Sequence, residues 1–219
     1  MSAALTHWQR DFIELSMKVG ALSFGEFKLK SGRISPYFFN AGKFYGGSTL
    51  AGLGRCYAAA IAEQKIECDF LFGPAYKGIP LVAATVVELF RNHQIDLPYS
   101  FNRKEAKDHG EGGIFVGAQP SGRALVVDDV ITAGTAVREV STMLNTEGVT
   151  QLAILIGLDR QERGQKSELS AAQELEKEDI PIFSIVSLSD IRQYIADELA
   201  DSDLLKRVDA YRDTYGVSL

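Results

Sequence analysis

Residues 123–136 read Arg-Ala-Leu-Val-Val-Asp-Asp-Val-Ile-Thr-Ala-Gly-Thr-Ala, and this stretch changes its physical character twice. The apolar run at 125–127 is typical of a strand that is buried on both faces of a sheet. Two carboxylates, Asp128 and Asp129, follow at the point where such a strand leaves the sheet. Residues 132–135 are small and hydroxylated, and the apolar spacing of residues 136–145 predicts a helix. The stretch therefore predicts a strand, a loop and a helix in succession.

The start of this helix predicts an anion-binding site. Backbone N–H groups are unpaired there, the helix dipole adds about half a positive charge, and Gly134 lets the main chain approach a ligand closely. A phosphate fits this position. Asp128 and Asp129 instead predict contacts with neutral hydroxyls or a metal-bound diol, because two carboxylates repel a bare phosphate. The alternative is that Asp129 or Thr132 only caps the helix.

The composition indicates one globular domain. The 219 residues are 46% hydrophobic and 24% charged, which allows a sizeable core. The net charge of −6 argues against nucleic acid or an acidic membrane as a partner. Cys56, Cys68 and three scattered histidines lack metal-ligand spacing, so we expect free thiols in a reducing compartment and no zinc site. Since neither a leader peptide nor a membrane span is evident, we expect a cytoplasmic location.

Hydrophobic periodicity predicts the other elements. We expect helices at residues 6–19, 45–64, 79–91, 170–178, 188–199 and 203–215, the second of them entering at Ser48 or Thr49. We expect strands at residues 70–72, 97–101, 152–158 and 182–186, and a β-hairpin within residues 24–40 around a Ser-Gly turn. No repeat or linker divides the chain, so residues 1–219 are expected to form a single domain.

A second strand–loop–helix passage repeats the pattern of the first. Residues 73–78 read Gly-Pro-Ala-Tyr-Lys-Gly and join the strand at 70–72 to the next helix. The repetition predicts a second anion site at the same sheet edge, with Lys77 supplying positive charge and the loop backbone supplying donors. The alternative is that Lys77 is a solvated surface lysine.

Residues 102–113 form a basic cluster in a net-acidic chain. The segment contains Arg103, Lys104, Lys107 and His109, no apolar residue larger than alanine, and closing glycines. Nothing anchors it to a core, so we expect a mobile loop, either merely solvated or acting as a cationic lid over a polyphosphate. Residues 114–116 are expected to pair back toward the strand before Asp128 and to complete a flap-like hairpin.

Two further positions suggest a planar, acidic ligand. Arg160 follows the strand at 152–158, where ligands of an open parallel sheet gather, and a guanidinium can hold a carboxylate with two hydrogen bonds. A structural salt bridge explains Arg160 equally well. Phe38 and Phe39 are consecutive on a strand, so one ring must face away from the core and could stack on a planar ligand.

Over essentially its whole length the chain resembles the orotate phosphoribosyltransferase family of bacterial and fungal type, within the type I phosphoribosyltransferases. The resemblance rests on motifs at residues 29–33 with 35–40, 73–78, 102–113, 127–135 and 158–164. It implies an α/β fold with a five-stranded parallel sheet flanked by helices, a small hood from about residues 20–45 and a flexible β-hairpin lid at about 102–114. The implied reaction, in pyrimidine biosynthesis, converts orotate and phosphoribosyl pyrophosphate (PRPP) into orotidine 5′-monophosphate and pyrophosphate.

The same resemblance implies roles for individual residues. Asp128 and Asp129 would hold the ribose hydroxyls, and Lys77 and Lys107 would act with them in catalysis. The implied PRPP contacts are Lys30, Tyr76, Lys77, Arg103, Lys104, Lys107, His109, Asp128, Asp129, Val130, Ile131, Thr132, Ala133, Gly134, Thr135 and Ala136. The implied orotate contacts are Phe38, Phe39, Thr132 and Arg160. Mg²⁺ is the implied cofactor, carried by PRPP near the two aspartates rather than in a protein cage. A homodimer whose lid serves the neighbouring subunit's site is also implied.

Two other functions are compatible with the sequence. The central loop is shared by phosphoribosyltransferases that use purines or uracil, and Arg160 with Phe38 and Phe39 is the feature that favours orotate. A non-catalytic PRPP sensor or RNA-binding module that kept the fold belongs to a different class, and the acidic balance and the basic lid disfavour it.

Overall fold

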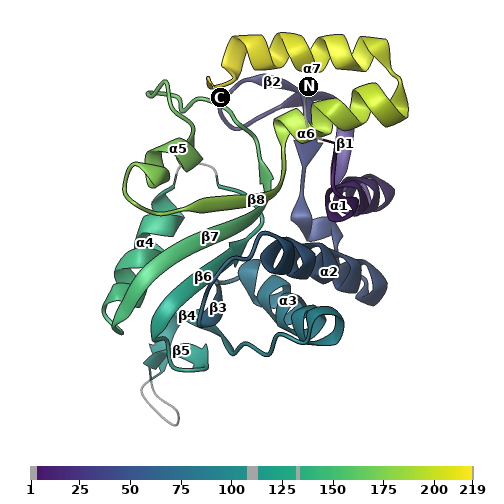
Figure 1. The fold of residues 1–219 in the computed structure, drawn as a ribbon. Coiled ribbons are helices and arrows are strands. Elements are labelled where there is room, and N and C mark those ends of the chain that lie inside the picture. Colours follow the sequence, from purple (N-terminus) through teal and green to yellow (C-terminus); the bar gives the residue numbers. More distant parts are fainter. Residues whose placement is uncertain (1–3, 108–112, 132–133, 219) are drawn as a thin grey trace.

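The computed structural model describes residues 4–107, 113–131 and 134–218. At its centre lies a sheet with the strand order β5-β4-β3-β6-β7-β8 (Figure 1). Its strands are β3 (Phe70–Gly73), β4 (Tyr99–Lys107), β5 (Gly113–Gly117), β6 (Gly122–Asp128), β7 (Val149–Asp159) and β8 (Ile182–Ser187). β3, β4, β6, β7 and β8 run parallel, and β5 pairs antiparallel with β4 at the edge. The predicted parallel sheet of five strands is therefore confirmed, with one antiparallel strand added.

Both faces of the parallel sheet are covered by helices. On β6, Leu125 and Val127 belong to the core beneath α1 (His7–Lys18), α2 (Gly47–Glu63) and α3 (Gly78–His93). Ala124 and Val126 belong to the core on the other face, beneath α4 (Thr135–Asn145) and α5 (Ala171–Glu176). Figure 1 shows these two helices on the side of the sheet opposite α2 and α3. Alternate side chains of one strand thus fill two separate cores, which is why its sequence reads as an unbroken apolar run.

A small second sheet lies beside the N-terminal helix. β1 (Leu22–Lys28) and β2 (Ile34–Phe39) pair antiparallel, which confirms the predicted hairpin, and a 3₁₀ turn (Ala41–Lys43) follows. The C-terminal helices α6 (Leu188–Tyr194) and α7 (Ser202–Tyr215) lie next to it (Figure 1). The ring of Tyr37 on β2 meets the ring of Tyr211 on α7 edge to face, with centroids 6.2 Å apart. The end of the chain therefore packs on a segment near its beginning.

Several predicted boundaries need correction. The predicted strand at 97–101 begins at Tyr99 and continues to Lys107, so residues 102–107 are strand rather than loop. Residues 114–116 lie in β5 and pair with β4, and not with the strand before Asp128, because β4 and β3 both lie between β5 and β6 in the sheet. The helix expected at 188–199 is α-helical only to Tyr194 and continues as a π-helical turn, Ile195–Leu199. α2 begins at Gly47, one residue before the predicted Ser48.

Two expectations from composition can be compared with the structure. Cys56 and Cys68 are free thiols, as predicted. Within the described ranges, every helix is too short or too polar to cross a membrane.

The contact between α2 and α3 predicts a test of core packing. A methyl group at Gly54 would lie 2.8 Å from the carbonyl oxygen of Ala84 on α3. Overpacking of this kind costs about 1–3 kcal/mol, against a gain of up to about 1 kcal/mol from the better helix propensity of alanine. We therefore expect Gly54→Ala to lower the urea midpoint of unfolding. Gly47→Ala on the same helix is the control, because no atom lies within 4 Å of the added methyl group. Equal midpoints for the two variants would contradict this account.

Candidate active site

The ends of three central strands bring the predicted site residues to one edge of the sheet. β3 pairs with β6 through Phe72 and Val126, and β6 pairs with β7 up to Asp128 and Ile156. Since all three strands are parallel, the residues that follow them emerge on the same side. Asp128 closes β6, Lys77 stands just before α3, and Arg160 follows β7 directly.

The two predicted anion sites meet through an ion pair. Lys77 Nζ lies 2.6 Å from Asp129 Oδ2. The aspartate is buried, whereas the lysine side chain is 60% exposed and reaches the carboxylate from the solvent side. The other oxygen, Oδ1, accepts a hydrogen bond from the backbone N–H of Val130 at 3.0 Å. Lys77 is therefore an exposed lysine whose charge faces the carboxylate pair.

Asp128 has an unusual electrostatic environment. Burial, followed by the charge of neighbouring Asp129, raises the pKa of its carboxyl from 3.8 to about 7. The backbone N–H of Asp129 donates to Asp128 Oδ1 at 2.8 Å, and this hydrogen bond lowers the same pKa. A carboxyl in this state is costly to ionise without a partner, which is typical of a functional site.

The backbone beneath the two carboxylates is held by partners from two elements. The hydroxyl of Tyr57, a fully buried side chain on α2, donates to the carbonyl of Asp128 at 2.8 Å. The N–H groups of Gly157 and Leu158 on β7 donate to the carbonyl of Asp129 at 3.0 and 3.3 Å. The backbone that carries both carboxylates is therefore held by groups outside the motif that contains them.

The start of α4 has the geometry predicted for the central motif. Gly134 is the N-cap residue with φ +70°, a conformation that suits glycine, and Thr135 and Ala136 open the helix with exposed side chains. Val130 and Ile131 join Asp129 to this start and are partly buried. Predictions for Thr132 and Ala133 lie outside the described residues.

The basic residues of β4 lie beside the loop that carries Lys77. Asn102 Oδ1 accepts a hydrogen bond from the backbone N–H of Ala75 at 2.9 Å. Lys104 Nζ lies 4.8 Å from the ring centroid of Tyr76, which is itself 66% exposed. Arg103 Nη1 donates to the carbonyl of Gly113 across the β4–β5 pair at 3.5 Å. The backbone of Lys107 ends β4, while its side chain and all of His109 lie outside the described part of the chain.

The residues predicted to bind a planar acid lie on β2 and at the end of β7. Phe38 is 40% exposed and stacks on Phe27 with centroids 5.6 Å apart, whereas the Phe39 ring lies 5.9 Å from Phe12. One ring thus faces outward and the other packs inward, as predicted. Arg160 forms the ion pair that was the alternative interpretation, with Glu162 at 2.7 Å.

Lys30 lies in the β1–β2 turn, exposed to solvent. Neither an ion pair nor a hydrogen bond joins it to the carboxylate pair within the described residues.

Sequence reasoning missed four residues that support this site. Tyr57 and Asn102 bond the backbone of the carboxylate and lysine loops, and Glu162 and Tyr37 contact Arg160. Glu162 alone had a usable sequence feature, an acid two residues after the candidate arginine. The other three act through contacts distant in sequence, so local patterns do not point to them.

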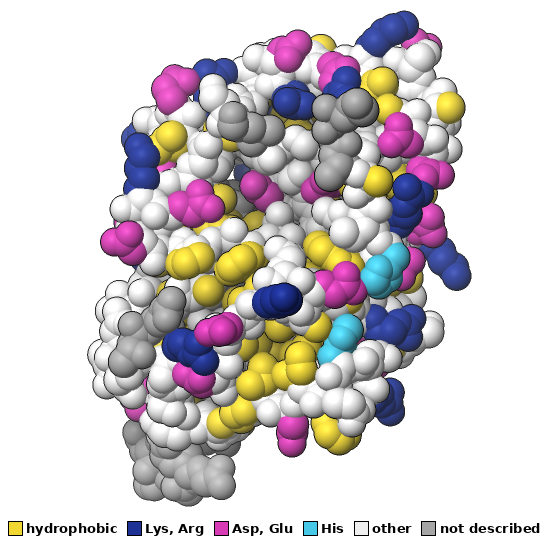
Figure 2. Space-filling view, viewed as in Figure 1, with side chains coloured by type: hydrophobic (Ala, Val, Ile, Leu, Met, Phe, Trp, Pro, Cys, Tyr) yellow, Lys and Arg dark blue, Asp and Glu magenta, His cyan; other side chains and the backbone are white. Residues whose placement is uncertain are grey.

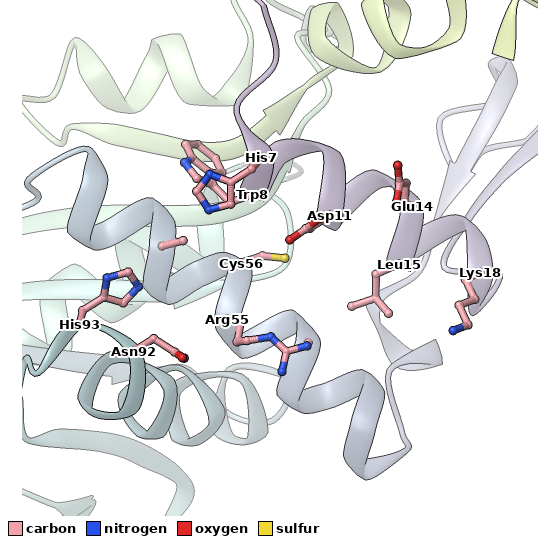
Figure 3. Close-up of a pocket in the computed structure, with 12 residues that line it drawn as sticks. His7, Trp8, Asp11, Glu14, Leu15, Lys18, Arg55, Cys56, Asn92 and His93 are labelled. Atoms are coloured by element: carbon pink, nitrogen blue, oxygen red, sulfur yellow. The ribbon is translucent and has the colours of Figure 1, made fainter. Parts of the chain in front are cut away.

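A separate cavity of about 520 Å³ lies between α1, α2 and α3. Figure 3 shows His7 and Asp11 of α1 on one side of Arg55 and Cys56, and His93 of α3 on the other. Burial raises the pKa of the Cys56 thiol to about 12, so the thiol at this cavity is unreactive. None of the predicted site residues lines it.

Comparison with known proteins identifies the family of the chain. Residues 50–187 match the phosphoribosyl transferase domain. Orotate phosphoribosyltransferase from Pseudomonas putida (strain W619) is 58% identical over 211 residues, which cover 96% of this chain and 99% of that protein. The Pseudomonas aeruginosa enzyme of the same name is 57% identical with the same coverage. The chain therefore belongs to the phosphoribosyltransferase family.

Solved structures agree with this assignment. The crystal structure of orotate phosphoribosyltransferase from Francisella tularensis superposes with a TM-score of 0.86 at 42% identity, covering 94% of this chain and 98% of that one. A crystal structure of adenine phosphoribosyltransferase, at 14% identity and a TM-score of 0.53, shares the fold alone.

The environment of Asp128 predicts how stability depends on pH. Its pKa is higher in the folded state, about 7 against 3.8, so between these values the folded chain binds the proton more tightly. This contribution to stability is present at low pH and is lost as pH rises through about 7. Asp128→Asn stays neutral, so its free energy of unfolding relative to wild type should increase from pH 5 to pH 8. Denaturant unfolding at both values measures this, with exposed Asp96→Asn as the control. If the free energies of unfolding of variant and wild type differ by the same amount at both pH values, the pKa of Asp128 is not raised in the folded state.

Proposed function

We propose that this protein is an orotate phosphoribosyltransferase, which transfers the phosphoribosyl group of PRPP to orotate and releases orotidine 5′-monophosphate and pyrophosphate in pyrimidine biosynthesis. The observation that carries this proposal is the meeting of Lys77 with the Asp128–Asp129 pair beside the start of α4. This arrangement offers acceptors for ribose hydroxyls, a cation for pyrophosphate and a helix start for the 5′-phosphate. The names of the close relatives support the same reaction.

The carboxylate pair and Lys77 would bind the two ends of the reacting bond. Asp128 and Asp129 accept hydrogen bonds from the ribose 2′ and 3′ hydroxyls, and their fixed backbone sets the position of the anomeric carbon. Lys77, with Tyr76 and the backbone of residues 75–78, faces the pyrophosphate. Lys77 is already held next to Asp129. Its ammonium therefore needs to move little to stabilise the negative charge that develops on the leaving pyrophosphate.

The loop into α4 would hold the 5′-phosphate. Val130, Ile131, Gly134, Thr135 and Ala136 are the described members of this loop, and the predicted contacts of Thr132 and Ala133 complete it. The unpaired N–H groups at the start of an 11-residue helix favour an anion. Phosphate and hydroxyl binding thus come from one continuous segment.

Mg²⁺ is the proposed cofactor. Among the described residues there is no group of three or more His, Cys, Asp or Glu side chains placed to hold a metal ion. The paired carboxylates nevertheless offer oxygen ligands of the kind that Mg²⁺ prefers. They therefore fit an ion bound mainly by the oxygens of PRPP, with Asp128 and Asp129 near it. Bound there, Mg²⁺ would neutralise charge on the pyrophosphate.

Orotate would lie between β2 and the end of β7. The exposed ring of Phe38 offers a stacking face, and Phe39 shapes the pocket through its backbone. The hydrogen bonds of Arg160 to Glu162 use Nε and Nη2, so the Nη1 end remains directed at a substrate carboxylate. Orotate already carries a nucleophilic ring nitrogen, and the enzyme has mainly to hold it near the anomeric carbon and stabilise the departing pyrophosphate through an oxocarbenium-like transition state.

The basic hairpin would close the site. Arg103, Lys104, Lys107 and His109 supply positive charge over the leaving group, with Lys30 approaching from the β1–β2 turn. Exclusion of water matters because water competes with orotate for the activated sugar. In this proposal residues 1–219 form one domain, with a hood at about 20–45 and a lid at about 102–114.

A homodimer is proposed as the working form. Val87 and Phe90 on α3 are 48% and 54% exposed, and Tyr45 is 87% exposed. Figure 2 shows hydrophobic side chains gathered over the lower centre, where α2 and α3 lie in Figure 1. Apolar surface of this kind supports contact with a second copy. We propose that the lid crosses this contact and serves the neighbouring site, that the enzyme is cytoplasmic, and that no nucleic acid or membrane takes part.

Orotate turnover tests the proposed reaction. We expect orotate absorbance to fall only when PRPP and Mg²⁺ are both present, and uracil and adenine to remain unchanged. The folded double variant Asp128→Asn with Asp129→Asn should be slower by about 10²-fold or more, because it loses contacts to the reacting sugar. Consumption of adenine or uracil in place of orotate, or full activity of the double variant, would refute the proposal.

Subunit mixing tests the shared site. We expect Lys77→Ala and Lys107→Ala each to be nearly inactive. In a mixed dimer with the lid acting across the interface, one site carries both defects and the other carries neither. Random reassociation of equal amounts should restore about a quarter of wild-type sites, by the symmetry of a closed dimer. Activity that stays at the level of the single variants, after subunit exchange has been verified, would rule out a lid shared between subunits.

A further inference from the structure

Glu162 gathers the polar contacts around Arg160. Its Oε1 accepts hydrogen bonds from Arg160 Nε at 2.8 Å and from Arg160 Nη2 at 2.7 Å, and from the Tyr37 hydroxyl at 3.1 Å. Its Oε2 lies 3.5 Å from Arg33 Nη1. The Glu162 side chain is only 12% exposed, so these are contacts of a largely buried carboxylate. One side chain thus connects the end of β7 with β2 and with the residue before it.

Two contacts hold the guanidinium group of Arg160, one at an edge of its plane and one at a face. Glu162 takes the Nε–Nη2 edge, and the ring of Tyr37 lies against the guanidinium plane with its centroid 5.0 Å from Cζ. These two contacts determine the position and the tilt of the plane. The hydrogen bonds of Arg160 to Glu162 use Nε and Nη2, and the Tyr211 hydroxyl also lies close enough to interact with the guanidinium. The Nη1 end of the fork is the part that we assign to a second carboxylate.

The backbone around Glu162 is itself fixed by the end of the chain. The N–H of Val217 donates to the carbonyl of Gln161, and the N–H of Arg163 donates to the carbonyl of Tyr215, both at 2.9 Å. Glu162 therefore sits between two hydrogen bonds to the C-terminal segment and not on a free loop. A carboxylate held in this way can orient its partner rather than follow it.

We propose that Glu162 is a positioning residue that sets orotate selectivity by fixing the guanidinium of Arg160, an inference that rests on the proposed function. The geometry supports it, because Glu162 occupies one edge of the Arg160 guanidinium and leaves the rest of that cation to a single substrate carboxylate. A base without a carboxylate gains nothing from the arrangement, so Glu162 acts on orotate alone.

Glu162 also has an opposite effect on the substrate, since a negative charge beside Arg160 repels a second carboxylate. When the charge of Glu162 is removed, the loss of orientation should raise the KM for orotate, and the loss of repulsion should lower it. In Glu162→Gln only one oxygen remains, so the amide must turn its NH₂ group either to Arg160 or to Arg33. Turned to Arg160, the NH₂ group faces two donors. Turned to Arg33, it leaves Arg160 with a neutral oxygen in place of a charged one, so in either case the hold on the guanidinium of Arg160 weakens. We therefore expect the loss of orientation to outweigh the loss of repulsion.

The test compares two acids in the same segment. Glu168 pairs with Arg163 at 2.8 Å but is 86% exposed, so Glu168→Gln is the matched control for Glu162→Gln. We expect Glu162→Gln to raise the KM for orotate about tenfold, as expected for losing one charge-assisted hydrogen bond. The KM for PRPP should remain within about twofold, because the partners of Glu162 are not among the proposed PRPP contacts. Glu168→Gln should change neither constant.

A double-mutant cycle separates positioning from general damage. Arg160→Lys should itself raise the KM for orotate, because lysine cannot form a two-pronged contact with a carboxylate. If Glu162 acts through Arg160, the double variant should be no worse than Arg160→Lys alone. Additive losses, a fall in the KM for orotate, or an equal rise for orotate and PRPP would each overturn the proposal.

Folding and substrate identity are checked separately. Thermal unfolding establishes whether Glu162→Gln is folded. If it is not, Tyr37→Phe removes one hydrogen bond to the same oxygen and keeps the ring, and should raise the same KM by about two- to fivefold. An unchanged KM in that variant would count against the proposal. A wild-type enzyme without orotate turnover would refute the proposed function and this inference with it, whereas an active wild type with an unaffected Glu162→Gln refutes the inference alone.

Discussion

The contact between Lys77 and Asp129 is the interaction on which the candidate site depends. It joins the loop after β3 to the loop after β6, and it exists because these two strands are neighbours with the same direction. A different strand order would separate the lysine from the carboxylates by at least one strand spacing, about 5 Å. The hydrogen bonds from Tyr57 and from β7 then hold the backbone that carries the two carboxylates. Strand order, rather than any single loop, thus creates the site.

The site is built at a cost in stability. Burial disfavours the ionised form of Asp128, and Asp129 beside it adds repulsion. Among the described residues, the exposed ammonium of Lys77 and the backbone N–H groups of Asp129 and Val130 offset the two adjacent carboxyl groups. A ligand that presents hydroxyls would donate hydrogen bonds to the two carboxylates. Groups that are unfavourable for folding can in this way be useful for binding. Glu162 is the contrasting case, because its partners are already in place.

Much of the fold could be predicted because local patterns and the fold agree. The apolar run of β6 predicted a strand buried on both faces, and the structure divides its side chains between two cores. Prediction failed where pairing, not propensity, decides the state. Residues 102–107 are polar and basic, and by pattern they read as a loop, but pairing with β5 through Asn102 and Lys107 extends β4 into this segment. Similarly, nothing local indicates that β5 pairs with β4 rather than with β6.

The sequence by itself determined the chemistry of the candidate site: the carboxylate pair, the glycine at the start of α4, the lysine loop and the arginine after β7. These are properties of short segments, where residue type and spacing suffice. Only the tertiary structure decided which groups support them. Tyr57, Asn102 and Tyr37 reach the site from other elements, and the C-terminal segment fixes the loop that carries Glu162. The physical reason is that a hydrogen bond depends on distance in space, and a chain folded into layers brings together residues that lie 27 to 125 positions apart.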